Sequence, residues 1–195
     1  MKETGILMSA PMVKAILEDR KTCTRRIMLP QPHIEQGILR WDKWKNTKSF
    51  VSINMTDHPD LAIPYCPYGQ VGDRLWVRET FRINIIGGVS YKADENESWI
   101  GKWKPSIFMP KKFARLWLEI TGVRAEHLQD IDSWDCIHEG ILQKYYSRFH
   151  NMFIDKPNSQ LISEFHVPWD SINAKRGYGW DTNPFVWPID YKRVK

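Results

Sequence analysis

The sequence predicts an α+β fold, a small and largely antiparallel β-barrel with short peripheral helices, from three observations. Roughly five to seven short segments show the alternation or β-branched content of strands, and about two or three show helical spacing. These segments do not alternate regularly along the chain, which disfavours a parallel, doubly wound sheet. With 195 residues, 42% of them hydrophobic, the chain can bury the core of one large domain.

The first expected elements are a short strand, a helix and an extended segment. Residues 6–9 have the apolar content of a strand, and Ser9 can cap a helix with Pro11 in its first turn. The helix is expected to end near Arg20, where a threonine-rich segment begins that favours extended structure. Its apolar side is formed by four residues at helical spacing, Met12, Val13, Ile16 and Leu17.

The remaining strands are predicted from alternation and from turn residues. Residues 38–44 and 49–54 can pair as a hairpin around Asn46-Thr47. Residues 185–191 form the last strand, and Pro188 places it at a sheet edge or a bulge because proline donates no backbone hydrogen bond. Three further strands are expected at residues 74–80, 89–93 and 113–123.

Two further helices are expected in the second half of the chain. Asp132 can cap a helix over residues 133–142. Residues 143–160 are weakly patterned, and a third helix covers residues 169–174 and ends at Gly177. These helices complete the expected set of peripheral elements.

The charge of the chain favours a polyanionic partner. The formal net charge is +5 and the pI is about 9.1. Cations gather at residues 20–26, 40–48, 102–115 and 191–195, and acids at residues 94–97 and 126–139. Aromatic residues make up 13% of the chain, and most should be core, while a minority can form a wall on which a base stacks.

Cysteine usage and the N-terminal residues point to the cytoplasm. The three cysteines, Cys23, Cys66 and Cys136, show no C-x-x-C pairing, which argues against a disulfide framework or a structural zinc site. The first residues lack the apolar core of a signal peptide, and no stretch approaches the length of a membrane span. We expect a protein of the reducing cytosol that does not associate with membranes.

The most informative motif is Arg20-Lys21-Thr22-Cys23-Thr24-Arg25-Arg26. Four of its seven residues are cationic, and two hydroxyls and a thiol lie among them. Such a segment can bind an anion, or it can place an amine beside a hydroxyl nucleophile. In a straight strand Lys21 and Thr24 point to opposite faces, so they converge only if the chain bends between them.

Two other segments are candidates for ligand contact. Arg78-Glu79 follows a predicted strand and is either a surface ion pair or a clamp at the mouth of the barrel. Lys102-Trp103-Lys104-Pro105-Ser106 and Lys111-Lys112 interleave cations with a ring, as single-strand grooves do, although a solvated basic loop explains them equally well. The six histidines show no paired spacing, so no metal site and no cofactor are expected.

Four motifs together resemble the ASCH domain family, whose fold is like that of the PUA RNA-binding domain. They are residues 20–26 behind a helix, Gly72 to Glu79, Ile137-His138-Glu139-Gly140-Ile141, and the closing patterns at 169–173, 177–180 and 183–187. The chain is similar to the long ASCH proteins of bacteriophages and prophages. The resemblance implies one PUA-like domain over residues 1–195, with insertions around 31–68, 81–105 and 143–168, in the cytoplasm of a bacterial host.

The resemblance also implies chemistry. The family looks like an RNA-binding or nucleotide-binding scaffold, and its small bacterial members include amidohydrolases that remove the acetyl group from N4-acetylcytidine with a Lys, a Thr and a Glu. These roles would fall on Lys21 as base, Thr24 as nucleophile and Glu139 as helper. Candidate substrate-binding residues are Arg25, Arg26, Arg78, Glu79, Trp103 and Ser106.

Two alternatives remain open. A non-catalytic module could bind single-stranded nucleic acid, RNA more readily than DNA, with Lys21, Arg25 and Arg26 on phosphates. A nuclease on the same scaffold is the weaker alternative, because the sequence shows no carboxylate cluster for metal ions. The expected partner is a nucleoside or a single strand in each case, and the oligomeric state is left open.

Overall fold

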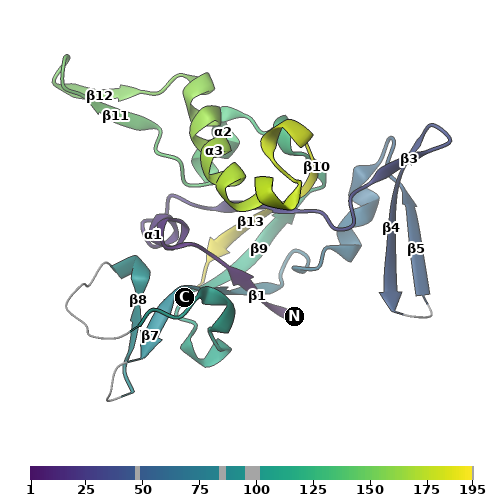
Figure 1. The fold of residues 1–195 in the computed structure, drawn as a ribbon, viewed down its shortest axis with the longest axis horizontal. Coiled ribbons are helices and arrows are strands. Elements are labelled where there is room, and N and C mark those ends of the chain that lie inside the picture. Colours follow the sequence, from purple (N-terminus) through teal and green to yellow (C-terminus); the bar gives the residue numbers. More distant parts are fainter. Residues whose placement is uncertain (47–48, 84–86, 95–101, 195) are drawn as a thin grey trace.

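The computed structural model describes residues 1–46, 49–83, 87–94 and 102–194, and it confirms the α+β class. Its described part is built on a mixed sheet that curls into a half-barrel (Figure 1). The strands along the sheet are β1 (Glu3–Leu7), β6 (Arg74–Arg78), β9 (Trp117–Val123), β13 (Phe185–Arg193) and β10 (Glu126–His127), and β2 (Cys23–Ile27) pairs with β13. The β1–β6 pair is parallel and the other pairs are antiparallel.

Three small sheets stand beside the half-barrel. The first contains β3 (His33–Glu35), β4 (Ile38–Asn46) and β5 (Ser49–Asn54), which confirms the hairpin predicted there; Thr47 of its turn lies outside the described residues. The second pairs β7 (Phe81–Ile83) with β8 (Val89–Tyr91), and the third pairs β11 (Lys144–Ser147) with β12 (Met152–Asp155). Figure 1 shows the first and third projecting from the body of the molecule.

The helices are short, apart from the last. They are α1 (Ala10–Leu17), α2 (Ser133–His138) and α3 (Asn158–Asn173). Short 3-10 turns cover Pro59–Tyr65, Lys92–Asp94, Ser106–Phe108, Lys111–Phe113, Leu128–Asp130, Ala174–Arg176 and Trp180–Thr182. Within the described ranges, no helix combines the length and the apolar character needed to cross a membrane.

The helix caps agree with the sequence only in part. The Asp132 side chain accepts a 2.7 Å hydrogen bond from the Asp135 amide, as predicted, whereas Ser9 makes no such side-chain bond. The first helix stops at Leu17 rather than near Arg20, because Asp19 takes a left-handed conformation with φ 54°. Similarly, α2 stops four residues before the predicted end, and Gly140 at φ +96° turns the chain away.

The third helix was underpredicted. Residues 158–168 belong to α3, although only residues 169–174 were expected to be helical. Pro168 inside the helix provides no backbone donor, which is why its sequence reads as a helix boundary. The weakly patterned stretch before it contains the β11–β12 hairpin, which was not predicted.

Three strand predictions need correction. The first strand is Glu3–Leu7 instead of residues 6–9, and β9 starts at Trp117 because a 3-10 turn occupies Lys111–Phe113. The last strand is not an edge: β13 pairs with β2 on one side and with β9 and β10 on the other. Pro188 is tolerated there because it faces Arg124, in the break between β9 and β10, where the ladder is interrupted; its carbonyl accepts a 3.0 Å bond from the Arg124 amide. A bulge, the other alternative predicted for this strand, is present two residues later.

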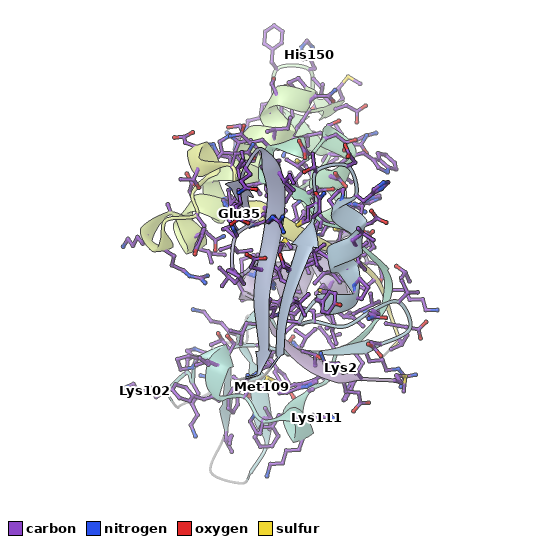
Figure 2. The ribbon with its side chains drawn as sticks, turned by 90° about the vertical axis from the view of Figure 1, so that its right-hand side faces the viewer. Lys2, Glu35, Lys102, Met109, Lys111 and His150 are labelled. Atoms are coloured by element: carbon purple, nitrogen blue, oxygen red, sulfur yellow. The ribbon has the colours of Figure 1, made fainter. Side chains whose placement is uncertain are left out.

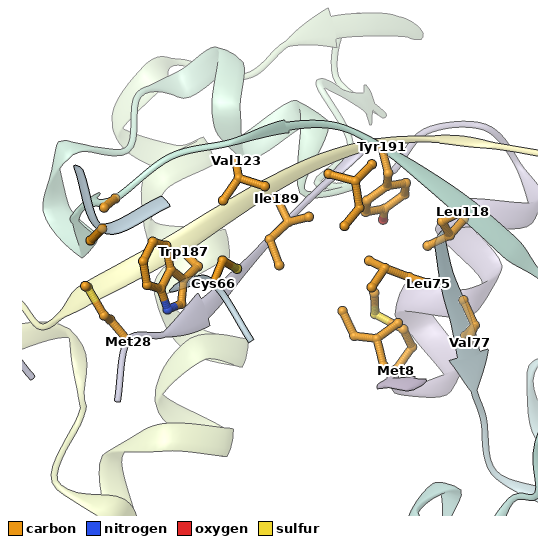
Figure 3. Packing of buried hydrophobic residues seen from close by; sticks show 14 of the residues in the cluster. Met8, Met28, Cys66, Leu75, Val77, Leu118, Val123, Trp187, Ile189 and Tyr191 are labelled. Carbon is orange, nitrogen blue, oxygen red and sulfur yellow. The ribbon is translucent and has the colours of Figure 1, made fainter. Parts of the chain in front are cut away.

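The core has two parts, one on each face of β2 and β13. The first fills the curl of the sheet, where Trp187 and Ile189 pack with Leu75, Val77 and Leu118 (Figure 3). The second lies between the sheet and helices α2 and α3, and consists of Leu128, Ile131, Cys136, Leu161, Phe165, Trp169 and Val186. Successive residues of β2 therefore face alternately the inside of the curl and the helices, which decides where each candidate site residue points.

Candidate functional site

Lys21 and Glu139, 118 residues apart, form a buried ion pair. The Lys21 amine contacts Oε2 of Glu139 and donates a second hydrogen bond, 2.9 Å long, to the Glu139 backbone carbonyl. Their side chains are 0% and 5% exposed. The two distant residues that the ASCH resemblance assigned to one site are thus in direct contact.

The backbone next to α2 places Glu139 beside β2. The Thr22 amide donates a 2.8 Å bond to the His138 carbonyl, and Lys21 and Glu139 form an antiparallel bridge. A side chain at Gly140 would come within 2.9 Å of Ala15 and 3.2 Å of Lys21, so only glycine allows this close approach. The segment that ends α2 therefore lies along the edge of β2 that β13 does not occupy.

The second carboxylate oxygen of Glu139 binds the strand itself. Oε1 accepts a 2.6 Å hydrogen bond from the Arg25 amide and lies 3.6 Å from the Arg25 guanidinium. Arg25 also donates to Glu126 at 2.8 Å and to Asp135 at 2.7 Å, and its side chain is fully buried. Burial alone would lower the pKa of Arg25, but the carboxylates, led by Glu139, raise it above its usual value.

Arg124 extends this network toward the solvent. Its guanidinium contacts Asp190 at 2.7 Å, Glu126 at 3.2 Å and Asp135 at 3.3 Å. Together with Lys21, Arg25 and Glu139, the network holds three cations and four carboxylates. The excess of negative charge means that this place does not attract a phosphate group.

The network was largely missed from sequence. Arg124, Glu126, Asp135 and Asp190 were not singled out, although the concentration of acids at residues 126–139 was a signal. Because these residues come from β10 and the connection before it, from α2 and from β13, only the fold shows that they meet near Arg25.

Thr24 points away from the ion pair. It is paired with Ile189, and directly opposite residues of an antiparallel pair share a face, so Thr24 faces the inside of the curl. It is 1% exposed, and no hydrogen bond in the described ranges joins its hydroxyl to Lys21 or Glu139. The Tyr191 hydroxyl on the same face is buried without a hydrogen-bond partner among the described residues, and burial, with the charge of Glu139, raises its pKa well above normal.

Cys23 faces the helices, beside Asp190 and Glu139. Burial, followed by the negative charges of Glu139 and Asp190, raises the pKa of this thiol far above its ordinary value. A thiol held in its protonated form is a poor nucleophile. The Cys23 thiol is therefore poorly suited to attack an acyl group.

The expected clamp Arg78-Glu79 is not a pair. Glu79 is buried and receives two 2.9 Å hydrogen bonds from Arg115, whereas Arg78 donates to the Ile107 carbonyl and lies over the Trp76 ring at 5.3 Å. Burial raises the pKa of Glu79, and Arg115 opposes that shift. Arg26 lies half-buried on the Thr24 face and donates to the Leu7 carbonyl at 2.6 Å.

The basic stretch is a separate surface. The Trp103 ring is half-buried beneath the Arg82 guanidinium at 4.4 Å, and half-buried Ser106 begins a 3-10 turn. Lys102, Lys104, Lys111 and Lys112 are exposed around them. Figure 2 shows Lys102 and Lys111 at the end of the molecule opposite His150. No hydrogen bond or ion pair in the described ranges joins this stretch to Lys21 or Glu139.

A hollow of about 330 Å³ lies elsewhere on the sheet, lined by Glu3, Arg74, Trp117 and Val194. It includes none of the candidate site residues. The residues that the structure describes contain no group of three or more His, Cys, Asp or Glu side chains arranged to hold a metal ion.

Comparisons with protein-family models, with curated proteins and with solved structures find no match for this chain. The assignment of a function consequently depends on the geometry and on the motifs of the sequence.

Proposed function

We propose that this protein is a PUA-like ASCH amidohydrolase that removes an N-acyl group from cytosine, as a free nucleoside or within a single strand. The observation that supports the proposal is the buried contact between Lys21 and Glu139. The motif resemblance assigns these two residues to one site although they are 118 positions apart, and the fold of the chain brings them together independently of that resemblance.

The ion pair suggests how the roles divide. In this proposal the Thr24 side chain must first reach across the edge of β2 to Glu139, because in the structure it faces the curl. The Glu139 carboxylate then accepts the hydroxyl proton as the threonine oxygen attacks the acyl carbonyl carbon, and the Lys21 ammonium donates a hydrogen bond to the developing oxyanion. The C–N bond then breaks, and the cytosine amine leaves with the proton from Glu139. Water hydrolyses the acyl-threonine ester, which releases the carboxylic acid and restores the hydroxyl. Lys21 is then an oxyanion donor rather than the base expected from sequence.

The charge balance of the network favours a neutral reacting group. An acylated cytosine base is uncharged, so it suits a place that holds one carboxylate in excess, whereas a phosphate does not. Phosphates of a longer substrate would have to contact other parts of the chain.

A second candidate, a non-catalytic nucleic-acid-binding module, is favoured by a different observation. The side chains of Lys21, Thr24 and Glu139 are at most 5% exposed, and Thr24 is not hydrogen-bonded to either of the other two. In this function the ion pair only fixes α2 to β2. Lys21 and Arg25 cannot then contact phosphates, because both side chains are fully buried.

Thr24→Val is the decisive variant. Valine has nearly the shape of threonine, and Thr24 is buried inside the curl opposite Ile189, where an apolar methyl group is readily accommodated, so the substitution should leave folding intact. Purified protein is incubated with N4-acetylcytidine and the release of cytidine is followed by chromatography. Glu139→Gln removes the proton acceptor, and Lys192→Met, in the exposed Lys192–Glu119 pair, is the matched control.

We expect turnover by the wild type and the control, and a loss of at least about a hundredfold in both site variants, the usual scale for an acid–base group. A folded Thr24→Val variant with wild-type turnover would overturn the assignment of the nucleophile. No turnover by the wild type, together with tight oligonucleotide binding, would favour the second candidate.

A further inference from the structure

Residues 143–156 form a projecting arm, the β11–β12 hairpin. In Figure 1 it extends from the layer of α2 and α3 into solvent. Its strands pair only with each other among the described strands, and the Lys156 amide closes its root with a 2.9 Å bond to the Gln143 carbonyl. An isolated two-stranded hairpin is only marginally stable in water, which makes its surface composition informative.

The arm exposes more apolar surface than a free hairpin needs. Phe149 at its tip is 91% exposed, Phe153 is 66% exposed and Met152 is 57% exposed. Tyr145 and Tyr146 are 42% and 50% exposed. Exposed apolar groups gathered in one place mark a binding surface.

Rings are presented on both faces of the arm. Tyr146 is paired with Phe153, and their rings meet edge to face at 5.5 Å. Tyr145 is paired with Ile154 on the opposite face, because successive strand residues alternate. The Phe149 ring lies 4.9 Å from the His150 ring, beyond the ends of both strands. A flat protein surface could cover only one of these faces, whereas a flexible single strand of nucleic acid can reach both.

The charge of the arm is positive. Lys144, Arg148 and Lys156 are its cations, and Asp155 is its only acid. Lys156 is engaged by Glu164 of α3, and Lys144 lies 3.9 Å from Asp155. Arg148 is exposed beside Phe149, and in the described part of the chain no ion pair engages it. Rings interleaved with cations are the composition that single-stranded nucleic acid binds.

The root of the arm is close to the candidate site. Lys144 follows Glu139 by five positions, a span of at most about 18 Å even when fully extended. The basic stretch around Lys102 and Lys111 is at the opposite end of the molecule from His150 at the tip of the arm (Figure 2). A nucleic-acid strand bound to the arm would therefore approach Glu139 from the side of α2.

We propose that the arm binds single-stranded nucleic acid: Phe149, Phe153 and the two tyrosines stack on bases, and Arg148 contacts phosphate. The arm would deliver one base of that strand toward the Lys21–Glu139 site, and this second element rests on the proposed function. Binding by the arm does not depend on hydrolysis.

The test measures binding of fluorescent twelve-nucleotide oligo(U) and oligo(dT) by anisotropy at several salt concentrations. Phe149→Ser is the main variant, because this exposed tip residue is not needed for strand pairing, and Phe153→Ser is the second. Ile34→Ser is the matched control, an equally apolar residue that is 76% exposed on β3. Arg148→Gln reports on phosphate contact, and turnover of free N4-acetylcytidine is measured for each variant.

We expect Phe149→Ser to weaken binding about 5- to 150-fold and Ile34→Ser to leave it unchanged. Arg148→Gln should reduce the slope of log K against log salt by about 0.7. Hydrolysis of the free nucleoside should not change in the arm variants, so the two proposals can fail separately. Wild-type protein that binds neither oligonucleotide, or arm variants that bind as well as the control, would overturn the proposal. So would a wild-type dimer that Phe149→Ser converts to monomer, because a second copy then covers the arm.

Discussion

Replacing Lys21 with methionine should destabilise the protein strongly, whatever its activity. The change keeps most of the side-chain volume but removes the ammonium group that bonds Oε2 and the backbone carbonyl of Glu139. The Glu139 carboxylate is then left buried, 5% exposed, without its principal counter-charge. Removing one partner of a buried pair costs about 3–5 kcal/mol, because the remaining charge is stranded.

The contacts that Glu139 keeps in Lys21→Met determine how much stability the variant should lose. The Arg25 amide at 2.6 Å and its guanidinium at 3.6 Å still face Oε1 of Glu139 and offset part of the loss. We therefore expect the lower limit, about 3 kcal/mol, equivalent to a fall in Tm of roughly 6–12 °C for a chain of this size. The double variant Lys21→Met with Glu139→Gln should lose less, because no buried charge remains unpaired.

Urea unfolding followed by tryptophan fluorescence measures these free energies. Lys192→Met is the control: its 2.7 Å partner is Glu119, but Lys192 is 61% exposed, and exposed pairs contribute less than about 1 kcal/mol. A Lys21→Met variant no less stable than this control would refute the reasoning. So would a double variant as unstable as the single one, because stranded charge would not then be the cause.

Three further predictions concern the elements around the pair. Burial raises the pKa of the Cys136 thiol to about 12, so as the pH rises the unfolded chain loses this proton before the folded chain does. The free energy of unfolding should therefore fall above about pH 9, by up to roughly 1.4 kcal/mol per pH unit. The fall should be less steep in Cys136→Ala, as measured by unfolding at each pH. Gly140→Ala should lower the melting temperature more than Gly177→Ala, since both glycines have positive φ but only Gly140 lies against Ala15 and Lys21. Equal losses of melting temperature would exclude this close approach. Asp132→Ala should lose about 1 kcal/mol in urea unfolding, whereas Ser9→Ala, with no cap bond, should lose almost nothing.

Local signals in the sequence were sufficient for several elements. The hairpin at residues 38–54 and the cap at Asp132 follow from turn and capping chemistry, which acts over a few residues. The alternation of Leu75 and Val77 with half-buried Trp76 and Arg78 predicted β6 for the same reason. Such signals need no knowledge of the rest of the fold.

Features that depend on distant partners could not be predicted in this way. Pro188 indicated an edge or a bulge. The strand does carry a bulge, between Asp190 and Tyr191, but it is interior, because β2 and β9 supply its neighbours from far along the chain. The carboxylates around Arg25 come from β10 (Glu126) and from α2 and its C-cap (Asp135 and Glu139), and no spacing in the sequence links them to β2. The arm has little local pattern because its rings point to both faces instead of toward one core.

Lys21 and Thr24, with their odd spacing, do not converge in the structure: Lys21 lies at the edge of β2 and Thr24 on one of its faces. Residue 22 precedes the strand; its amide bonds His138 on one side, and its carbonyl accepts from the Tyr191 amide on the other. This lets the Lys21 amine meet Glu139 at the strand edge, while Thr24 turns into the curl beside Ile189. In the proposed reaction, the substrate and the Thr24 side chain would therefore have to meet at the edge of the strand, next to the Lys21–Glu139 pair. Thr24→Val tests this point directly, because only a reaction that crosses the edge needs that hydroxyl.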